Sequence, residues 1–153
     1  MKAIVDRIKE IKSKYGLRMQ PPATEKEIAL LKQKMKEEHG IVLPSDYVEM
    51  IQISNGLEFS GLRVYGSHTN PIVGYSDRFI EGLLEANAIW WKNTEIKHYL
   101  FLGEDDLSLY GLNSDTGEFE ELDRTSLDLI ETYPTFSALI SNSVEVRIDS
   151  LES

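Results

Sequence analysis

Apolar residues near the amino terminus recur at helical spacing. Ile4, Ile8, Ile11 and Tyr15 predict an amphipathic helix over residues 1–15 that ends at Gly16. Residues 1–20 therefore form a helix and a connector ahead of the Pro21-Pro22 pair.

A second helix is predicted to begin after Thr24. Thr24 and Glu27 form a capping-box pattern, in which each side chain bonds an otherwise unpaired backbone amide. The helix runs to about His39 and stops at Gly40. Its buried face consists of Ile28, Leu31 and Met35. Its opposite face is either a basic docking surface or a solvated helix face, and it carries Lys26, Lys32, Lys34 and Lys36.

The next segment combines a short helix with a tight hairpin. Pro44 cannot continue a preceding helix, and Ser45 can cap the new one by accepting a hydrogen bond from a free amide. The Asn55-Gly56 pair stops this helix, because glycine reaches positive φ without steric cost. A hairpin over residues 57–66 follows, with its turn at Ser60-Gly61.

A third main helix is predicted in the middle of the chain. Ser76 or Asp77 caps it, and it extends to about Trp91. The apolar residues expected to be buried on this helix are Phe79, Ile80, Leu83, Leu84, Ala88 and Ile89. Trp90 and Trp91 point about 100° apart on a helix. We therefore expect one in the core and one partly exposed, where it could anchor a partner.

The rest of the chain predicts mainly strands. They cover residues 99–104, 107–112 and 118–122, and Gly117 is the left-handed position of the turn between the last two. The Glu120-Glu121 pair breaks alternation and predicts a bulge or an exposed edge. A short strand over 127–132, a helix capped by Thr135 through about Ile140, and a strand over 144–148 complete the chain. These elements predict one α+β domain over residues 1–153, with several helices packed against a mainly antiparallel sheet.

Composition fits this fold. The chain has 153 residues, 41% of them apolar, which is enough for an ordinary core, and it has no cysteine. The first residues are charged throughout and lack the hydrophobic core of a signal peptide, and no stretch approaches the ~20 apolar residues that span a bilayer. We expect a cytoplasmic protein without membrane contact.

The net charge of −10 is distributed unevenly. Residues 1–40 hold ten Lys and Arg against six Asp and Glu, whereas residues 41–153 hold six against twenty. The strongest acidic run covers residues 104–131, in which Arg124 is the only cation. Such a field repels nucleic acid and attracts basic partners, mainly by raising the association rate.

The order of several segments resembles the SUKH superfamily, which includes yeast cell-wall assembly regulators and many bacterial immunity proteins. The segments are the helix and hairpin of residues 43–66, Phe101-Leu102-Gly103-Glu104, the strand around Tyr110, residues 120–124 and residues 130–136. The chain is similar to the YrhA-like bacterial branch in particular, over roughly residues 21–140. The resemblance implies the same α+β arrangement and an immunity protein that neutralises a cognate toxin. It implies no catalytic residue.

Patterns for catalysis or metal binding are weak. Asp105-Asp106 occupies a predicted turn, where acidic residues are common. Asn113, Asp115 and Gly117 lack the full ligand set of a calcium loop. No nucleophile elbow or phosphate-binding glycine pattern occurs. The three histidines lack metal-ligand spacing; they are His39, His68 and His98. We expect no catalytic residue, metal or cofactor.

The leading hypothesis is a noncatalytic protein-binding module. The resemblance implies, more specifically, an immunity protein that neutralises a toxin. A nuclease toxin would suit the acidic segment, because nucleases are usually basic. Solubility alone is the alternative explanation of its acidic residues. A regulatory scaffold and an enzyme acting on a small basic substrate are the alternative functions. We expect a monomer or weak homodimer. The predicted partner-binding face consists of Glu104, Asp105, Asp106, Asp115, Glu118, Glu120, Glu121 and Asp123, with Tyr110 or Trp91 as an apolar anchor.

Overall fold

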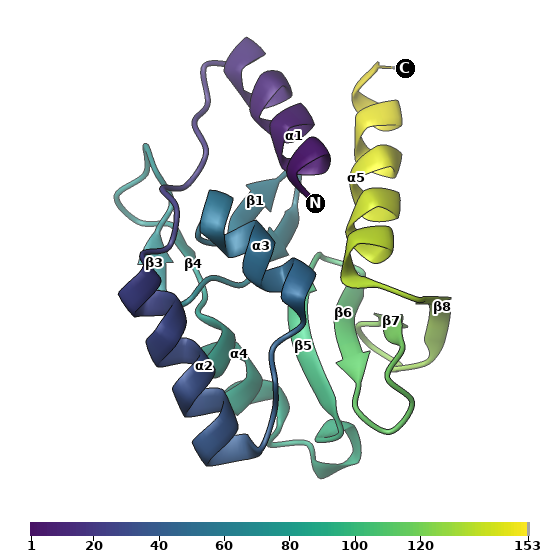
Figure 1. The fold of residues 1–153 in the computed structure, drawn as a ribbon. Helices are drawn as coiled ribbons and strands as arrows, with labels where there is room; N and C mark the ends of the chain where they lie inside the picture. The colour runs from purple at the N-terminus through teal and green to yellow at the C-terminus, as the bar shows by residue number, and fades with distance from the viewer. Residues whose placement is uncertain (153) are drawn as a thin grey trace.

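A six-stranded antiparallel sheet lies at the centre of the computed structural model, which describes residues 1–152 (Figure 1). Its strand order is β1-β2-β5-β6-β7-β8. The strands are β1 (Leu57–Phe59), β2 (Leu62–Val64), β5 (Tyr99–Glu104), β6 (Ser108–Asn113), β7 (Phe119–Asp123) and β8 (Leu129–Tyr133). A separate two-stranded antiparallel sheet pairs β3 (Asn70–Pro71) with β4 (Phe79–Ile80).

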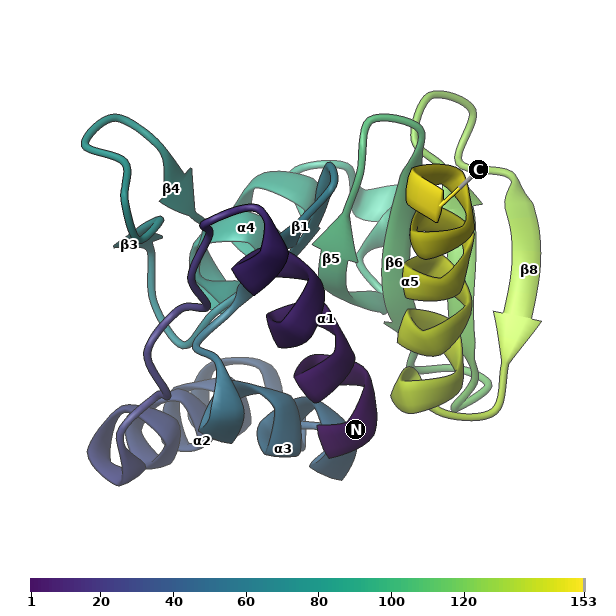
Figure 2. The same ribbon diagram turned by 90° about the horizontal axis from the view of Figure 1, so that it is seen from above.

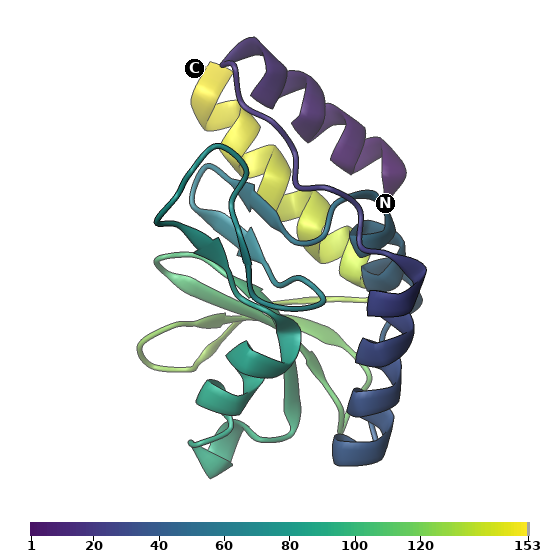
Figure 3. The same cartoon turned by 90° about the vertical axis from the view of Figure 1, so that its left-hand side faces the viewer.

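The helices cover both faces of the large sheet, with α4 on one face and α1, α3 and α5 on the other (Figures 2 and 3). They are α1 (Lys2–Lys14), α2 (Glu25–His39), α3 (Ser45–Ile53), α4 (Leu83–Trp90) and α5 (Phe136–Glu152), with a short 3-10 helix, η1, at Thr94–Ile96. Helix α2 packs beside α3. The predicted α+β class with a mainly antiparallel sheet is therefore confirmed. None of the helices formed by residues 1–152 combines the length and apolar character needed to cross a bilayer.

The local signals before residue 41 predicted both helices correctly, but Tyr15, expected on the apolar face of the first, is 64% exposed and follows the last residue of α1. Helix α2 has both hydrogen bonds of the capping box: the Glu27 amide donates to Thr24 Oγ1 at 3.1 Å, and the Thr24 amide donates to Glu27 Oε1 at 2.8 Å. Gly40 ends the helix in the left-handed region, with φ 66°.

The tight turns of the sheet were also predicted correctly. Ser60 and Gly61 have φ of 48° and 86° in the turn between β1 and β2, and Gly117 has φ of 78° between β6 and β7. The expected bulge is present, because the register between β7 and β8 shifts at Glu121 and Leu122. These features depend on backbone conformations that the local sequence favours.

Ser45 does not cap α3, contrary to the prediction. The helix begins at Ser45 itself, with Pro44 in the cap position and no capping bond from a side chain. Because Ser45 is already inside the helix, its hydroxyl is displaced from the position that reaches a first-turn amide.

The predicted third helix was wrong in its first half. Phe79 and Ile80 form β4, and α4 begins only at Leu83. The reason is long-range backbone pairing: the Gly66 amide donates to the Glu81 carbonyl at 3.0 Å, and the Leu83 amide donates to the Gly66 carbonyl at 2.9 Å. These bonds engage groups that a continuous helix would pair within itself.

The buried set expected on that helix was correct only in part. Ile80 and Leu83 are buried, and Leu84 packs partly buried against the core. Phe79, Ala88 and Ile89 are exposed. Phe79 lies outside the helix, in β4. Ala88 and Ile89 are in α4 but lie off its buried face, which is formed by Leu83, Ala86 and Asn87.

The strand expected over residues 144–148 is also wrong, since α5 continues through it to Glu152. Leu139, Ile140, Val144 and Ile148 are all buried and recur every three to four residues, as on one helix face. In a strand, Val146 would be buried on the same face as Val144 and Ile148, but it is 59% exposed.

A carboxylate on α3 caps α5, ninety-one positions away in sequence. Asp46 Oδ2 accepts hydrogen bonds from the Ser137 amide at 2.8 Å and from the Ser137 hydroxyl at 3.1 Å. Thr135 supplies a second, local cap, since its hydroxyl accepts from the Ala138 amide at 3.1 Å. The two caps anchor the start of α5 over the sheet.

Replacing Asp46 with alanine should therefore lower the free energy of unfolding by about 1–2 kcal/mol, the usual cost of losing a helix cap. Urea unfolding followed by circular dichroism measures this change. Glu49→Ala, at an exposed position of the same helix, is the control and should have little effect. Equal losses in the two variants would contradict the capping role.

Candidate protein-binding groove

The predicted site residues do not share one exposed face. Four are buried, namely Glu104, Asp105, Tyr110 and Glu120. Three are exposed, namely Asp106, Asp115 and Glu118, and three are partly buried, namely Trp91, Glu121 and Asp123. The exposed acids are also divided between the two ends of the β6–β7 hairpin, because Asp106 precedes β6 whereas Asp115 and Glu118 lie in the turn that follows it. The six residues of β6 separate these ends by about 17 Å.

Glu104 belongs to a buried ion cluster on the α4 face of the sheet. Its carboxylate accepts hydrogen bonds from Arg63 at 2.9 Å and from the Tyr65 hydroxyl at 2.9 Å, and it pairs with Arg124 at 3.2 Å. Arg124 also lies over the Trp90 ring, 5.3 Å from its centre. Because this carboxylate is enclosed and neutralised, it holds the fold together and does not contribute to the outer surface.

Glu120 and Trp91 are also held by internal bonds. The Tyr99 hydroxyl donates to Glu120 at 2.6 Å, and Asn113 donates to the other carboxylate oxygen at 3.3 Å. The Trp91 indole N–H donates to the Tyr99 carbonyl at 2.7 Å. Burial, together with the bond to Glu120, raises the pKa of Tyr99 above its ordinary value. The Tyr99 hydroxyl therefore stays protonated and remains a donor.

Asp123 shapes the turn before β8. Its Oδ1 accepts from the amides of Thr125 and Ser126 at 2.9 and 2.8 Å. These backbone bonds lower the pKa of its carboxyl group. Asp123 was predicted to lie on the partner-binding face, but its carboxylate instead holds the backbone of this turn.

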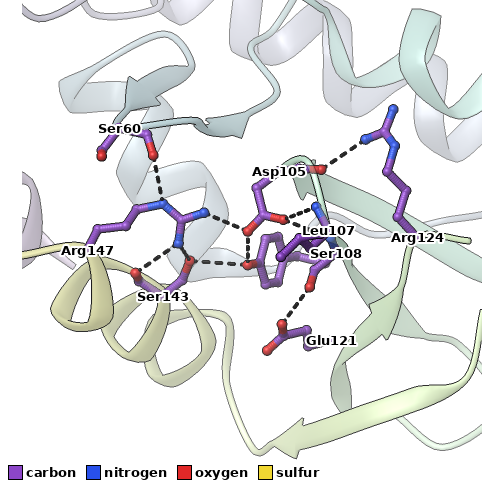
Figure 4. A network of polar contacts seen from close by, with 9 residues as sticks. Ser60, Asp105, Leu107, Ser108, Glu121, Arg124, Ser143 and Arg147 are labelled. Atoms are coloured by element: carbon purple, nitrogen blue, oxygen red, sulfur yellow. Dashed lines mark hydrogen bonds and ion pairs between the residues drawn. The ribbon is translucent and has the colours of Figure 1, made fainter. Parts of the chain in front are cut away.

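Asp105 ties the sheet to the last helix (Figure 4). One carboxylate oxygen accepts from the amides of Leu107 and Ser108 at 2.8 and 2.7 Å. The other accepts from the Tyr110 hydroxyl and from Arg147 of α5, both at 2.6 Å. The carboxylate thus joins the β5–β6 turn, strand β6 and helix α5.

The ionised form of Asp105 is favoured. Burial raises the pKa of its carboxyl group, but the hydrogen bonds from Tyr110, Arg147 and the two amides outweigh burial and hold the pKa below the ordinary value. The same contact acts on Tyr110 in the opposite sense, since burial and the Asp105 bond raise the pKa of that hydroxyl.

A groove of about 400 Å³ opens beside this network, between the sheet and α5. Its apolar walls are Leu107, 78% exposed, and Val146, 59% exposed. We define the α5 groove by six of its lining residues: Leu107, Ser108, Tyr110, Glu121, Val146 and Arg147. It combines apolar walls with a polar floor, as binding pockets commonly do.

Residues 98–152, which supply nearly all of the groove lining, expose only negative charges. After Lys97 the described chain contains two Arg and no Lys, and both are drawn into internal ion pairs: Arg124 with Glu104 at 3.2 Å and Arg147 with Asp105 at 2.6 Å. Every exposed charged side chain from residue 98 to residue 152 is consequently a carboxylate. These residues are Asp106, Asp115, Glu118, Asp128, Glu131, Glu145, Asp149 and Glu152. Of these, Glu145 pairs with Arg7 of α1.

A serine and a histidine lie close together elsewhere, at the loop after β2. The Ser67 hydroxyl is 2.9 Å from His68 Nδ1, and Glu27 of α2 approaches the same nitrogen at 3.2 Å. A serine-hydrolase triad uses opposite ring nitrogens for the serine and the carboxylate. The contacts instead connect the loop to α2. Among residues 1–152, no group of three or more His, Asp or Glu residues is placed to hold a metal ion.

Comparison with known proteins gave no relative: no family model matches the chain, and no curated protein does. The geometry of the groove and the charge of its surroundings therefore carry the functional argument.

Sequence reasoning missed the contribution of α5 to the groove. Arg147, Ser143 and Val146 were not selected, because residues 144–148 alternate as a strand would. The recurrence of Phe136, Ile140, Val144 and Ile148 at four-residue intervals was the signal for a helix. It would have placed Arg147 on a helix but could not have paired it with Asp105.

The Asp105 network predicts a pH-dependent stability difference. Asp105→Asn should lower the free energy of unfolding at neutral pH by about 2–3 kcal/mol, because Arg147 loses its charged acceptor. The pKa of Asp105 is lower in the folded protein, so its stabilisation is fully present above the unfolded value of about 3.9 and is lost as pH falls through the folded pKa. The difference between the wild type and the variant should therefore shrink below about pH 4.

Urea unfolding of both proteins between neutral and strongly acidic pH checks this. Asp106→Asn is the matched control, because Asp106 is the exposed neighbour in the same turn. The role assigned to Asp105 would be contradicted by a difference that stays constant with pH, or by an equal loss in the control.

Proposed function

We propose that this protein is a noncatalytic protein-binding module that recognises a basic partner protein through the acidic surface around the α5 groove. One observation carries the proposal: both arginines beyond Lys97 are consumed by internal ion pairs, so the exposed charges of this region are all negative. A surface of one sign raises the association rate of an oppositely charged partner.

The same region also offers apolar contact area. Leu107, Leu129, Ile130 and Val146 are each more than half exposed, and they lie on the β5–β6 turn, β8 and α5. Apolar residues beside acidic ones suit a protein partner, because the apolar contacts supply affinity while the charges supply speed and selectivity. Such a surface disfavours nucleic acid, whose phosphates it would repel.

The resemblance to the SUKH superfamily supports a narrower proposal, that the partner is a cognate toxin and the protein acts as an immunity protein. A nuclease toxin would fit the charge argument, since a phosphate-binding surface is basic. An acidic inhibitor could cover that surface without any covalent chemistry.

Coexpression tests the narrower proposal. The product of the gene immediately upstream is the first partner to examine: expressed alone it should arrest growth, and expression of this protein beside it should restore growth. Continued cell death despite stable coexpression would contradict the immunity role. Recovery of signalling proteins with no toxic partner would favour a regulatory scaffold instead.

Charge reversal tests the binding surface once a partner is in hand. The triple variant Glu118→Lys, Asp128→Lys and Glu131→Lys removes exposed carboxylates from the sheet side of the surface. Its association rate at low salt should fall by about tenfold or more, and the salt dependence of that rate should flatten. Stopped-flow measurement over a range of salt concentrations gives both values.

The control variant makes the same change in net charge at exposed positions of α2 and α3. It carries Glu37→Lys, Glu38→Lys and Glu49→Lys. If it slows association as much as the first variant, the effect comes from net charge, and the surface around the α5 groove has no special role.

A further inference from the structure

We infer that the α5 groove receives a single cationic side chain, an arginine or lysine of the partner protein, whose charged end meets Glu121 between Leu107 and Val146. This inference rests on the proposed function and specifies the point of contact.

The groove contains a carboxylate without a cationic partner. Glu121 is partly buried on the floor, and the Ser108 hydroxyl donates to its Oε2 at 2.7 Å (Figure 4). No Lys, Arg or His of residues 1–152 forms an ion pair with it, in contrast to Glu104 and Asp105. A partly desolvated carboxylate of this kind gains most from a charge-assisted bond.

The one cation that lines the groove, Arg147, forms no ion pair with Glu121, because four of its five N–H donors bond other groups. Nε donates to the Ser60 carbonyl at 3.2 Å, and one terminal nitrogen donates to Asp105 at 2.6 Å. The other donates to the Ser143 carbonyl and hydroxyl at 3.1 and 2.8 Å. Arg147 is therefore fixed against Asp105, and the charge of Glu121 remains uncompensated.

The same bonding disfavours an anionic occupant. A phosphate or carboxylate entering the groove would find the guanidinium of Arg147 already neutralised by Asp105, with four of its five N–H donors committed, and would face Glu121 directly. The exposed carboxylates Asp106 and Asp149, on the adjoining turn and helix, would repel it further.

The walls fit the stem of a long cationic side chain. Leu107 and Val146 are exposed and line the groove from the β5–β6 turn and from α5. Lysine and arginine bury their methylene groups against apolar surface while the charged end reaches a polar group. The volume of about 400 Å³ accommodates one such side chain.

A titration followed by amide chemical shifts tests the inference on the full chain. The probe is a capped pentapeptide with a central arginine flanked by leucines. Its binding should shift the amides of Leu107, Ser108, Glu121 and Val146. A peptide with glutamine in place of arginine should bind about tenfold more weakly, because it lacks the charge-assisted bond.

Two protein variants locate the contact. Glu121→Gln should weaken the arginine peptide by about tenfold. The control Glu49→Gln, at an exposed carboxylate on α3 outside the groove, should leave affinity unchanged. Val146→Lys keeps Glu121 but places a competing ammonium group at the groove wall, and it should also weaken binding. The amide spectrum of each variant reports whether it is folded.

The inference fails if Glu49→Gln weakens binding as much as Glu121→Gln, if Val146→Lys has no effect, or if the shifts centre on the β6–β7 turn. Shifts on exposed carboxylates outside the groove would refute this contact and leave the proposed function standing. The proposed function has its own separate test in the coexpression experiment.

Discussion

The ion pair between Asp105 and Arg147 is the interaction on which the arrangement of the site depends. Asp105 gathers two turn amides, the Tyr110 hydroxyl and the α5 guanidinium around one carboxylate. The turn, the sheet and the last helix therefore share a single acceptor. Breaking such a pair leaves a poorly solvated charge, so its geometry is strongly enforced once the core is formed. The α5 groove has its shape because this contact fixes both of its sides.

The pairing also sorts the charges of residues 98–152. Arg124 and Arg147 neutralise Glu104 and Asp105, and hydroxyl and amide donors satisfy Glu120. Carboxylates that build the fold are thus separated from those that remain at the surface. Because Arg124 and Arg147 form internal ion pairs, the exposed charges of this segment are all negative. This uniform charge is a consequence of folding and not simply of composition. The negative surface charge favours both solubility and the recognition of a basic partner.

This division makes the number of acidic residues a poor guide to a binding face. Asp105 and Asp106 are neighbours in one turn, yet the first is buried and the second exposed. Glu120 and Glu121 are neighbours on one strand, yet the first is bonded to Tyr99 and the second reaches the groove. In a strand, adjacent side chains point to opposite faces, so a run of acids is divided between two environments. Function in such a surface depends on which carboxylates the fold leaves without a partner.

The sequence by itself determined the local elements and the fold class. The Thr24–Glu27 capping box, the left-handed Gly40 and Gly117, and the strands around β5–β7 follow from short-range sterics and hydrogen bonding. Tertiary structure decided the rest. Backbone pairing with Asn70 and Pro71 made residues 79–80 a strand, and packing against the core made residues 144–148 helical where local alternation was ambiguous. It also decided the site, because pairing Arg147 with Asp105 joins residues forty-two positions apart. Burial and charge pairing of that kind depend on the folded neighbourhood, which periodicity along a chain does not encode.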